Sequence, residues 1–423
     1  MERIVASIIT IGDELLIGQV VDTNSAWMGS ELNKNGIWVA HRVAVGDVRE
    51  DIWQALDDEF NRSRLIFITG GLGPTADDIT KPLLCEYFGG KLVVDAGALD
   101  NVKNIFTRLQ RPMIDRNLQQ AEVPDTCTVI PNRRGTAPGM WFEKEGRIFV
   151  SMPGVPHEMK GMMTDTVIPG IRSRFRLPFI AHRTLLTAGI GESFLADHIK
   201  TFEENLPAAI RLAYLPNYGM VRLRLTIQGE DPGASTKILQ SNFDTLKERV
   251  AEWLVADEDI PIQEAVGKLL QSRSKTLGTA ESCTGGYIAH LITSIPGSSE
   301  YFKGSIVSYA NEIKTNLLHV PPATLAADGA VSQATVEAMA RGALEQLGAD
   351  YVIATSGIMG PGGGSPEKPV GTVWIAVGNR QNITAQKFSF RFDRGRNIEL
   401  AATNALNQLR KFILSADPPG QYH

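Results

Sequence analysis

The sequence predicts an α/β protein made of several domains, and three observations support this fold class. The chain has 423 residues, too many for one ordinary domain. Hydrophobic residues make up 43% of it and charged residues 21%, so the chain can bury several cores and is unlike a disordered protein. Strand-like and helix-like segments alternate in the first and last thirds, as in a parallel sheet flanked by helices. We expect domains at residues 1–170, 171–256 and 257–416.

The first third shows this alternation most clearly. Strand-like segments cover residues 4–11, 38–45 and 65–69, and helix-like segments cover 24–35 and 51–62. In open α/β sheets, ligands bind at the carboxyl ends of the strands. Two polar clusters follow such ends: Gly12, Asp13 and Glu14, and then the run 69–81, which reads TGGLGPTADDITK.

The run 69–81 predicts a site for phosphate and metal. Its glycines follow a strand, and their backbone N–H groups suit phosphate oxygens; they are Gly70, Gly71 and Gly73. Asp77 and Asp78 suit a hard cation such as Mg²⁺, which proteins usually hold with one or two carboxylates plus phosphate.

The same run is also consistent with a capped helix start. Thr75 and Asp78 have the spacing of a capping box, and this role is compatible with ligand binding. Further acids that could face the same crevice are Asp13, Glu14 and Glu158, the last in the run SMPGVPHEM, although each alone reads as a helix-start or surface carboxylate.

The pattern changes near Pro169, where a smaller α+β unit begins. Strand-like segments cover 184–190 and 221–228, and helix-like segments cover 193–205 and 242–253. An acidic stretch with a proline, 257–261, then reads as a linker to the last domain.

The last third contains the most informative motif, a strand, a tight turn and a helix start. A helix is predicted at 263–272, a strand at 276–280, the turn ESCTGG at 281–286 and a helix at 287–295. Ser282 is a candidate nucleophile at the turn, with Cys283 as a rival. Helix N-termini stabilise anions, so the turn suggests chemistry on a small anionic substrate. The N–H groups that would hold a developing oxyanion belong to Cys283, Thr284, Gly285 and Gly286.

Ser282 needs a base to become nucleophilic at neutral pH. His290 and His319 both read as structural residues, so a Ser–His–Asp triad has little support. Lys314 follows a strand-like run in the motif IVSYANEIK, and a Ser–Lys pair is an alternative, with Tyr309 as a proton relay. To act as a base Lys314 must be neutral, so burial or nearby positive charge must lower its pKa.

A glycine-rich loop predicts a second part of this site. The run 355–371 reads TSGIMGPGGGSPEKPVG, and its loop 360–364, which includes Gly362 and Gly363, resembles a phosphate or ribose cradle. Thr355 and Ser356 supply hydroxyl donors at its start. In the later motif DRGR, Arg394 and Arg396 either hold a phosphate or form a solvated face.

The motifs AESCTGG, YANEIK, SGIMGPGGG and KPVGTV, in this order, resemble the C-terminal domain of the CinA family. That domain is similar to nicotinamide mononucleotide (NMN) deamidases, α/β amidohydrolases that convert NMN to nicotinic acid mononucleotide and ammonia without a cofactor. The resemblance implies that Ser282 is the nucleophile, Lys314 its base and Tyr309 a helper. It also implies that Arg396, and either Thr355 or Ser356, contact the substrate or support the Ser–Lys pair. Met359 stands where the family usually has small residues, and would narrow the pocket without removing a reactive group.

The first-third motifs, above all GGLGPTADDIT, resemble the molybdopterin-binding-like domain of the same family, a doubly wound sheet. There the domain looks like an ADP-ribose pyrophosphatase that uses a divalent metal, with potassium assisting. The related fold in cofactor assembly binds molybdopterin, so the fold does not fix the substrate. The middle unit resembles a KH fold, but residues 171–255 lack the GXXG loop of a nucleic-acid-binding KH module, which favours a spacer or dimer element.

Charge and cysteine content exclude some classes of function. The net charge of −5 disfavours a general nucleic-acid binder. Cys85, Cys127 and Cys283 are widely spaced, which fits reduced thiols in the cytosol rather than a zinc cage. No apolar run approaches the roughly 18 residues that span a bilayer, and no signal peptide is expected.

Together with these features, the family resemblance implies a cytoplasmic, homodimeric hydrolase with two activities, on NMN and on ADP-ribose, both products of NAD breakdown. The alternatives are a non-catalytic protein that binds molybdopterin or a nucleotide, and a competence-related interaction protein.

Overall fold

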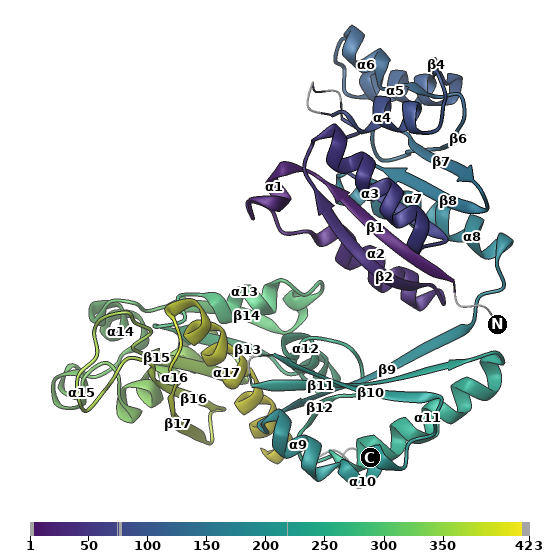
Figure 1. Ribbon diagram of the computed structural model, residues 1–423. Coiled ribbons are helices and arrows are strands. Elements are labelled where there is room, and N and C mark those ends of the chain that lie inside the picture. Colours follow the sequence, from purple (N-terminus) through teal and green to yellow (C-terminus); the bar gives the residue numbers. More distant parts are fainter. Residues whose placement is uncertain (1–3, 74, 76–77, 218, 417–423) are drawn as a thin grey trace. The chain divides into compact units, whose positions relative to one another are not determined.

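The computed structural model of the chain describes residues 4–73, 75, 78–217 and 219–416 (Figure 1). Its contacts form two compact units. The first comprises the described part of Met1–Ala181 with Gln228–Thr236, and the second comprises His182–Ile227 with the described part of Lys237–His423. Within the described residues, no helix is both long and apolar enough to cross a membrane.

The first unit is built on a six-stranded sheet in the order β2-β1-β3-β8-β7-β6. Its strands are β1 Val5–Ile11, β2 Trp38–Val45, β3 Leu65–Thr69, β6 Thr128–Ile130, β7 Gly139–Lys144 and β8 Arg147–Met152. The strands β2, β1, β3 and β8 run parallel, which confirms the predicted parallel core of the sheet. The hairpin of β7 and β8 was not predicted, and it adds an antiparallel edge.

Helices cover both faces of this sheet. Met28 and Leu32 of α2 and Met159 of α7 pack on one face with Ile8 and Phe67, and α3 and α4 pack on the other. The helices are α1 Asp13–Leu16, α2 Thr23–Lys34, α3 Arg49–Arg62, α4 Thr80–Tyr87, α5 Ala96–Arg108, α6 Asp115–Gln119, α7 Pro156–Met162 and α8 Ile168–Arg174, with a π-helical turn at Met163–Val167. A separate small hairpin pairs β4 Leu92–Val94 with β5 Glu122–Pro124.

A second, four-stranded sheet has the order β10-β11-β9-β12. Its elements are β9 Phe179–Ala188, α9 Glu192–His198, α10 Lys200–Glu204, β10 Ile210–Asn217, β11 Met220–Gly229, α11 Pro232–Arg249 and β12 Leu254–Ala256. Side chains alternate along β11, where Leu223, Leu225 and Ile227 are buried, as the sequence pattern predicted. The predicted single helix at 193–205 breaks at Ile199, and α11 begins earlier than predicted because Pro232 is tolerated in the first helical turn.

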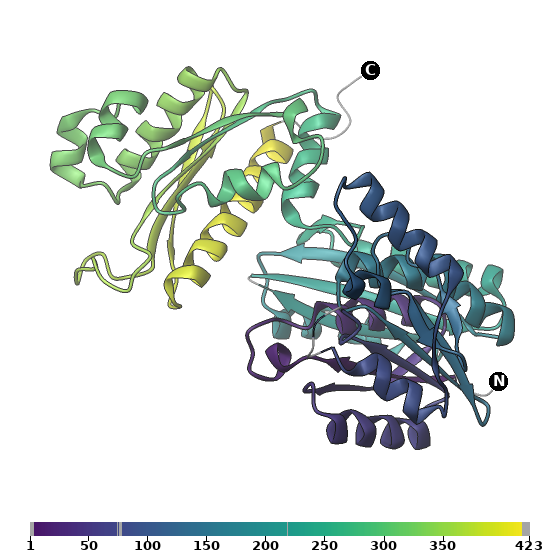
Figure 2. The same ribbon diagram turned by 90° about the horizontal axis from the view of Figure 1, so that it is seen from above.

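The last part of the chain forms a five-stranded sheet in the order β14-β13-β15-β16-β17. The strands are β13 Leu277–Glu281, β14 Phe302–Val307, β15 Tyr351–Gly357, β16 Thr372–Gly378 and β17 Ile383–Ser389. The helices are α12 Ile262–Ser272, α13 Tyr287–Thr293, α14 Asn311–Leu318, α15 Pro322–Asp328, α16 Gln333–Leu347 and α17 Arg394–Ala416, with a 3₁₀ turn at Ser298–Glu300. Figure 2 shows α17, in yellow, running along this sheet.

Two apolar layers hold these helices to the sheet. Residues of α12, α13 and α17 pack on one face against Ile353 and Ile375, and residues of α14 and α16 pack on the other against Ala280 and Val352. Strands β14, β13 and β15 are parallel, with Glu281 level with both Val307 and Thr355. The carboxyl ends of all three strands therefore meet at one edge, and the candidate site lies there.

Candidate active site

Ser282 lies in the turn that joins β13 to α13. Its backbone N–H donates to the carbonyl of Thr355 at 3.0 Å, which ties the turn to the neighbouring strand. Gly285 and Gly286 have φ values of 61° and 97°, a region that favours glycine, so these two residues allow the chain to reverse so sharply. Ser282 is only 8% exposed, and it lines a pocket.

Lys314 projects from α14 toward this turn. Its Nζ atom lies 3.1 Å from Ser282 Oγ, 2.7 Å from the carbonyl oxygen of Ser308 and 3.1 Å from that of Tyr309. The side chain is 1% exposed although it carries an amine. The structure thus brings together the serine and the lysine that the sequence singled out, residues that are far apart along the chain.

Burial lowers the pKa of Lys314, because the charged form loses its hydration. A neutral amine keeps two N–H donors and one lone pair. The two carbonyl groups can accept the two N–H bonds, so the lone pair is left for the hydroxyl hydrogen of Ser282. This arrangement suits a lysine that takes a proton from serine.

The pocket in front of Ser282 has a volume of about 270 Å³. Nine of the residues predicted to act here line it: Ser282, Cys283, Tyr309, Lys314, Ser356, Gly360, Gly362, Gly363 and Arg394. Met359, the departure from the family pattern, lines it as well. Residues that were not predicted also line it: Asn311, Ala330, Val331, Gly357 and Ile358. Asn311 could have been inferred, because it precedes Lys314 by three residues and so shares its helix face.

The motif DRGR offered both Arg394 and Arg396, and the family resemblance implied Arg396, but the arginine that lines this pocket is Arg394. Arg394 donates from Nη1 to the carbonyl of Gly360 at 2.8 Å and from Nη2 to Tyr309 Oη at 3.2 Å. Arg396 instead lies over the Phe392 ring, 5.2 Å from its centroid. Both belong to the first turn of α17, and residues two apart on a helix point in nearly opposite directions.

The remaining predicted contacts are not among the residues that line the pocket: Thr284, Gly285, Gly286 and Thr355. Thr284 and Thr355 are buried and join their hydroxyl groups at 2.8 Å.

The expected anion site at the start of α13 is already filled by the chain itself. The carboxylate of Glu281 accepts the N–H groups of Gly286, Ile288 and Ala289. The prediction that this helix start faces substrate is therefore wrong. The backbone N–H of Cys283 lies beside Ser282, and in the described part of the chain this N–H donates to no other backbone group.

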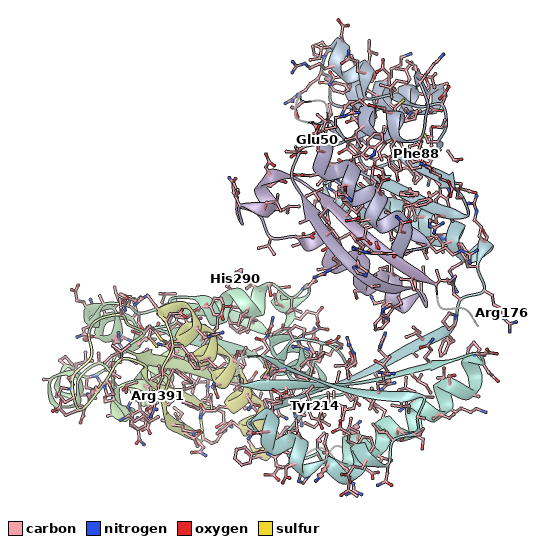
Figure 3. All side chains as sticks on the ribbon, in the orientation of Figure 1. Glu50, Phe88, Arg176, Tyr214, His290 and Arg391 are labelled. Atoms are coloured by element: carbon pink, nitrogen blue, oxygen red, sulfur yellow. The ribbon has the colours of Figure 1, made fainter. Side chains whose placement is uncertain are left out.

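The rival nucleophile and the histidines are less suited to the chemistry. Burial raises the pKa of Cys283 to about 12, so its thiol stays protonated at neutral pH. Neither His290 nor His319 lines the pocket. His290 is exposed on α13 and points outward (Figure 3), and His319 shares a hydrogen bond with Gln346.

The first unit contains a larger pocket, of about 430 Å³, at the carboxyl ends of β1 and β3. The predicted phosphate ligands Gly70, Gly71 and Gly73 all line it. Gly70 has a φ of 115°, and a Cβ atom there would lie 2.1 Å from the carbonyl oxygen of Ile11. Only glycine fits this position, where the backbone approaches closely and stays open to a ligand.

Four acids share the pocket with these glycines: Glu14, Asp47, Asp78 and Glu158. Asp78 accepts hydrogen bonds from the N–H of Thr75 at 2.9 Å and from its hydroxyl, and Glu158 accepts one from Asn132 at 2.7 Å. Because α4 begins only at Thr80, the pair of Thr75 and Asp78 closes a loop and does not cap the helix.

The donor set is compatible with a hard cation. Over the described residues, no group of three or more His, Cys, Asp or Glu side chains is placed to hold a metal, and Asp77, the other predicted ligand, lies outside them. Mg²⁺ usually takes only one or two carboxylates and obtains further oxygens from phosphate and water. Asp78, in the same pocket as the three glycines predicted to bind phosphate, is compatible with that requirement.

Three family models match successive parts of the chain. Residues 7–173 match the family model "Probable molybdopterin binding domain", 182–256 match "Damage-inducible protein CinA KH domain" and 259–413 match "CinA C-terminal domain". A CinA-like protein of Cytophaga hutchinsonii is 44% identical over 97% of this chain and 98% of its own length. Another, of Chloroherpeton thalassium, is 44% identical over 96% of this chain and 99% of its own.

Among solved structures, a competence/damage inducible protein from Agrobacterium tumefaciens is 37% identical. It covers 36% of this chain and 92% of its own, with a TM-score of 0.35. The two full-length relatives and the three matched domains, in this order, show that the chain belongs to the CinA family.

Proposed function

We propose that the C-terminal domain is an amidohydrolase that converts NMN to nicotinic acid mononucleotide and ammonia. The observation that supports it most is the buried pair of Ser282 Oγ and Lys314 Nζ, 3.1 Å apart at the wall of a pocket of about 270 Å³. A lysine whose pKa is lowered by burial serves as a base at neutral pH, and the family resemblance supplies the substrate.

The reaction would proceed in two displacements. Lys314 takes the hydroxyl proton of Ser282, and Oγ forms a bond to the carboxamide carbon. The carbon–nitrogen bond then breaks, and Lys314 returns the proton to the departing ammonia. Water, deprotonated by the same amine, attacks the acyl-serine ester, which releases the carboxylate product and restores the serine. The N–H of Cys283 is the donor proposed for the oxyanion of both tetrahedral intermediates.

The rest of the pocket suits the rest of the substrate. Arg394 and the N–H groups of Gly362 and Gly363 would hold the phosphate. Tyr309 is 63% exposed, and its ring offers a face to the cationic pyridinium.

Ammonia release from NMN tests this proposal. We expect Ser282→Ala to abolish it with the fold intact by circular dichroism, while Cys283→Ala, the matched change at the neighbouring residue, retains most of it. Full activity of Ser282→Ala together with loss in Cys283→Ala would assign the chemistry to the thiol and overturn the proposal.

We also propose that the N-terminal domain hydrolyses the pyrophosphate of ADP-ribose. The supporting observation is one pocket that combines Gly70, Gly71 and Gly73 with Asp78. Glycine N–H groups would bind and orient the phosphates, and Asp78 would hold a divalent cation. When bound, such a cation neutralises charge on the pyrophosphate, with potassium as a further activator.

ADP-ribose incubated with Mg²⁺ distinguishes catalysis from binding. We expect AMP and ribose 5-phosphate, a loss of at least about tenfold in Asp78→Asn, and no change in Asp51→Asn, which replaces an exposed acid on α3. If ADP-ribose binds and stays intact, the domain is a binding module for a nucleotide or for molybdopterin.

A further inference from the structure

We propose that Glu281 is a positioning residue, whose buried carboxylate holds the Ser282 turn in the shape that the dyad requires. The inference rests on the proposed amidase function. Glu281 is the last residue of β13 and is fully buried, with 0% exposure. A buried carboxylate is costly unless hydrogen bonds satisfy it, so its presence beside the nucleophile needs a reason.

The side chain of Glu281 closes the turn through hydrogen bonds to the residues that follow Ser282. Its Oε2 atom accepts the N–H of Gly286 at 3.0 Å, the N–H of Ile288 at 3.1 Å and the hydroxyl of Thr284 at 2.7 Å. Its Oε1 atom accepts the N–H of Ala289 at 2.8 Å. These bonds join the residue before Ser282 to the residues after it, so the nucleophile stands at the apex of a closed ring.

The backbone of Glu281 reaches the other half of the dyad. Its carbonyl accepts the N–H of Ser308 at 2.8 Å, and the carbonyl of Ser308 in turn accepts Lys314 Nζ at 2.7 Å. A displacement of Glu281 would therefore move both the turn that carries Ser282 and the peptide that holds Lys314.

Only a carboxylate can accept hydrogen bonds from all of these donors. Both oxygens accept from N–H groups and from hydroxyls, because Oε1 also accepts from the hydroxyl of Thr279 at 3.4 Å and from that of Ser305 at 3.5 Å. A glutamine has nearly the same shape, but its NH₂ group would have to point either at Ala289 N–H or at the donors around Oε2. Aspartate would be too short by one methylene to reach past Ser282 to the helix.

The charge of Glu281 has a second effect, on Cys283. Burial is the main cause of the raised pKa of this thiol, and the negative charge of Glu281 adds to it. The same carboxylate that shapes the turn therefore also helps to keep the neighbouring thiol protonated.

Glu281→Gln in the full-length chain tests the inference, with Asp350→Asn as the matched control. Asp350 is also a carboxylate bound to an N–H and a hydroxyl, both of Thr276, but it precedes β15 at the other end of the strands. We expect Glu281→Gln to lower kcat for NMN about a hundredfold with KM within about threefold, since small displacements of reacting groups have effects of that size. Asp350→Asn should change neither.

Two measurements without substrate separate this inference from the amidase proposal. Labelling of Ser282 by a fluorophosphonate should slow in Glu281→Gln, and alkylation of Cys283 by iodoacetamide should begin at lower pH, whereas Asp350→Asn should behave as wild type. If wild type has no NMN activity, the amidase proposal fails while these readouts still decide the role of Glu281.

A second variant covers the case in which Glu281→Gln does not fold. Thr284→Val is isosteric and removes one donor to Oε2, so we expect an intermediate slowing of Ser282 labelling. If Glu281→Gln folds, labelling of Ser282 and alkylation of Cys283 at wild-type rates would overturn the inference. If it does not fold, labelling of Ser282 at the wild-type rate in Thr284→Val would overturn it.

Discussion

The Nζ atom of Lys314 lies 3.1 Å from the Oγ atom of Ser282, and the lysine is held there by two backbone carbonyls that accept from the same nitrogen. Burial lowers the pKa of Lys314. The pH dependence of the activity should report this shift directly. We expect kcat/KM for NMN to rise with pH as Lys314 loses its proton, with a midpoint below the ordinary lysine pKa of 10.5.

Lys314→Arg replaces the base with a group that stays protonated. We expect a loss of roughly 10²- to 10⁴-fold in kcat, the usual contribution of a general base. Lys303→Arg, at an exposed position of β14, is the control and should leave kcat unchanged. A Lys314→Arg enzyme with near-normal kcat would show that another group removes the serine proton.

Stability should depend on pH through the same lysine. Because burial lowers its folded-state pKa, the unfolded chain binds more protons between that pKa and the ordinary value of 10.5, and the protonated lysine destabilises the folded state at lower pH. The penalty is complete below the folded-state pKa and is relieved as pH rises toward the unfolded-state value. The free energy of unfolding of wild type, relative to Lys314→Met, should therefore increase from pH 7 to pH 10 in urea titrations. A difference that is flat or falls with pH would contradict a lowered pKa.

Arg394 and Arg396 form a matched pair for testing phosphate recognition. Hydrogen bonds to charged groups contribute about 1.5–3 kcal/mol, so Arg394→Ala should raise KM for NMN by about 10- to 100-fold. The effect should disappear with nicotinamide riboside, which has no phosphate. Arg396→Ala should leave both values unchanged, because Arg396 does not line the pocket. Equal effects on the two substrates would assign Arg394 a structural role.

Gly70→Ala should distort the N-terminal pocket. A Cβ atom at Gly70 would lie 2.1 Å from the carbonyl oxygen of Ile11, and φ is 115°. We expect a loss of more than about 2 kcal/mol in the free energy of unfolding and loss of ADP-ribose turnover. Gly89→Ala is the control, since Gly89 also has a positive φ of 67° but no atom within 4 Å of the added carbon. Its cost should be only about 1 kcal/mol.

Sequence patterns identified the parts of the fold that depend on local periodicity and turn chemistry. Strands 38–45 and 65–69 were predicted at their observed bounds, and the pairing of Ser282 with Lys314 followed from two strand ends of one parallel sheet. The hairpin of β7 and β8 was missed because its residues Gly139–Lys144 and Arg147–Met152 pair with each other across a short turn within an otherwise parallel pattern.

Details that depend on the third dimension could not be read from the chain. The choice between Arg394 and Arg396 depends on the direction in which α17 begins. The acid in AESCTGG gave no sign that its side chain turns back onto the helix that follows, since that contact depends on the positive φ angles of Gly285 and Gly286.

The Glu281 carboxylate at the start of α13 also affects which end of the pocket suits an anion. On the proposed function, the Glu281 carboxylate at the start of α13 would repel an incoming phosphate from the Ser282 end of the pocket, and the guanidinium of Arg394 near Gly360 would attract it. A phosphorylated amide would thus bind preferentially with its phosphate away from Ser282. The reversed orientation, with the anion against Ser282, would be disfavoured before any covalent bond forms.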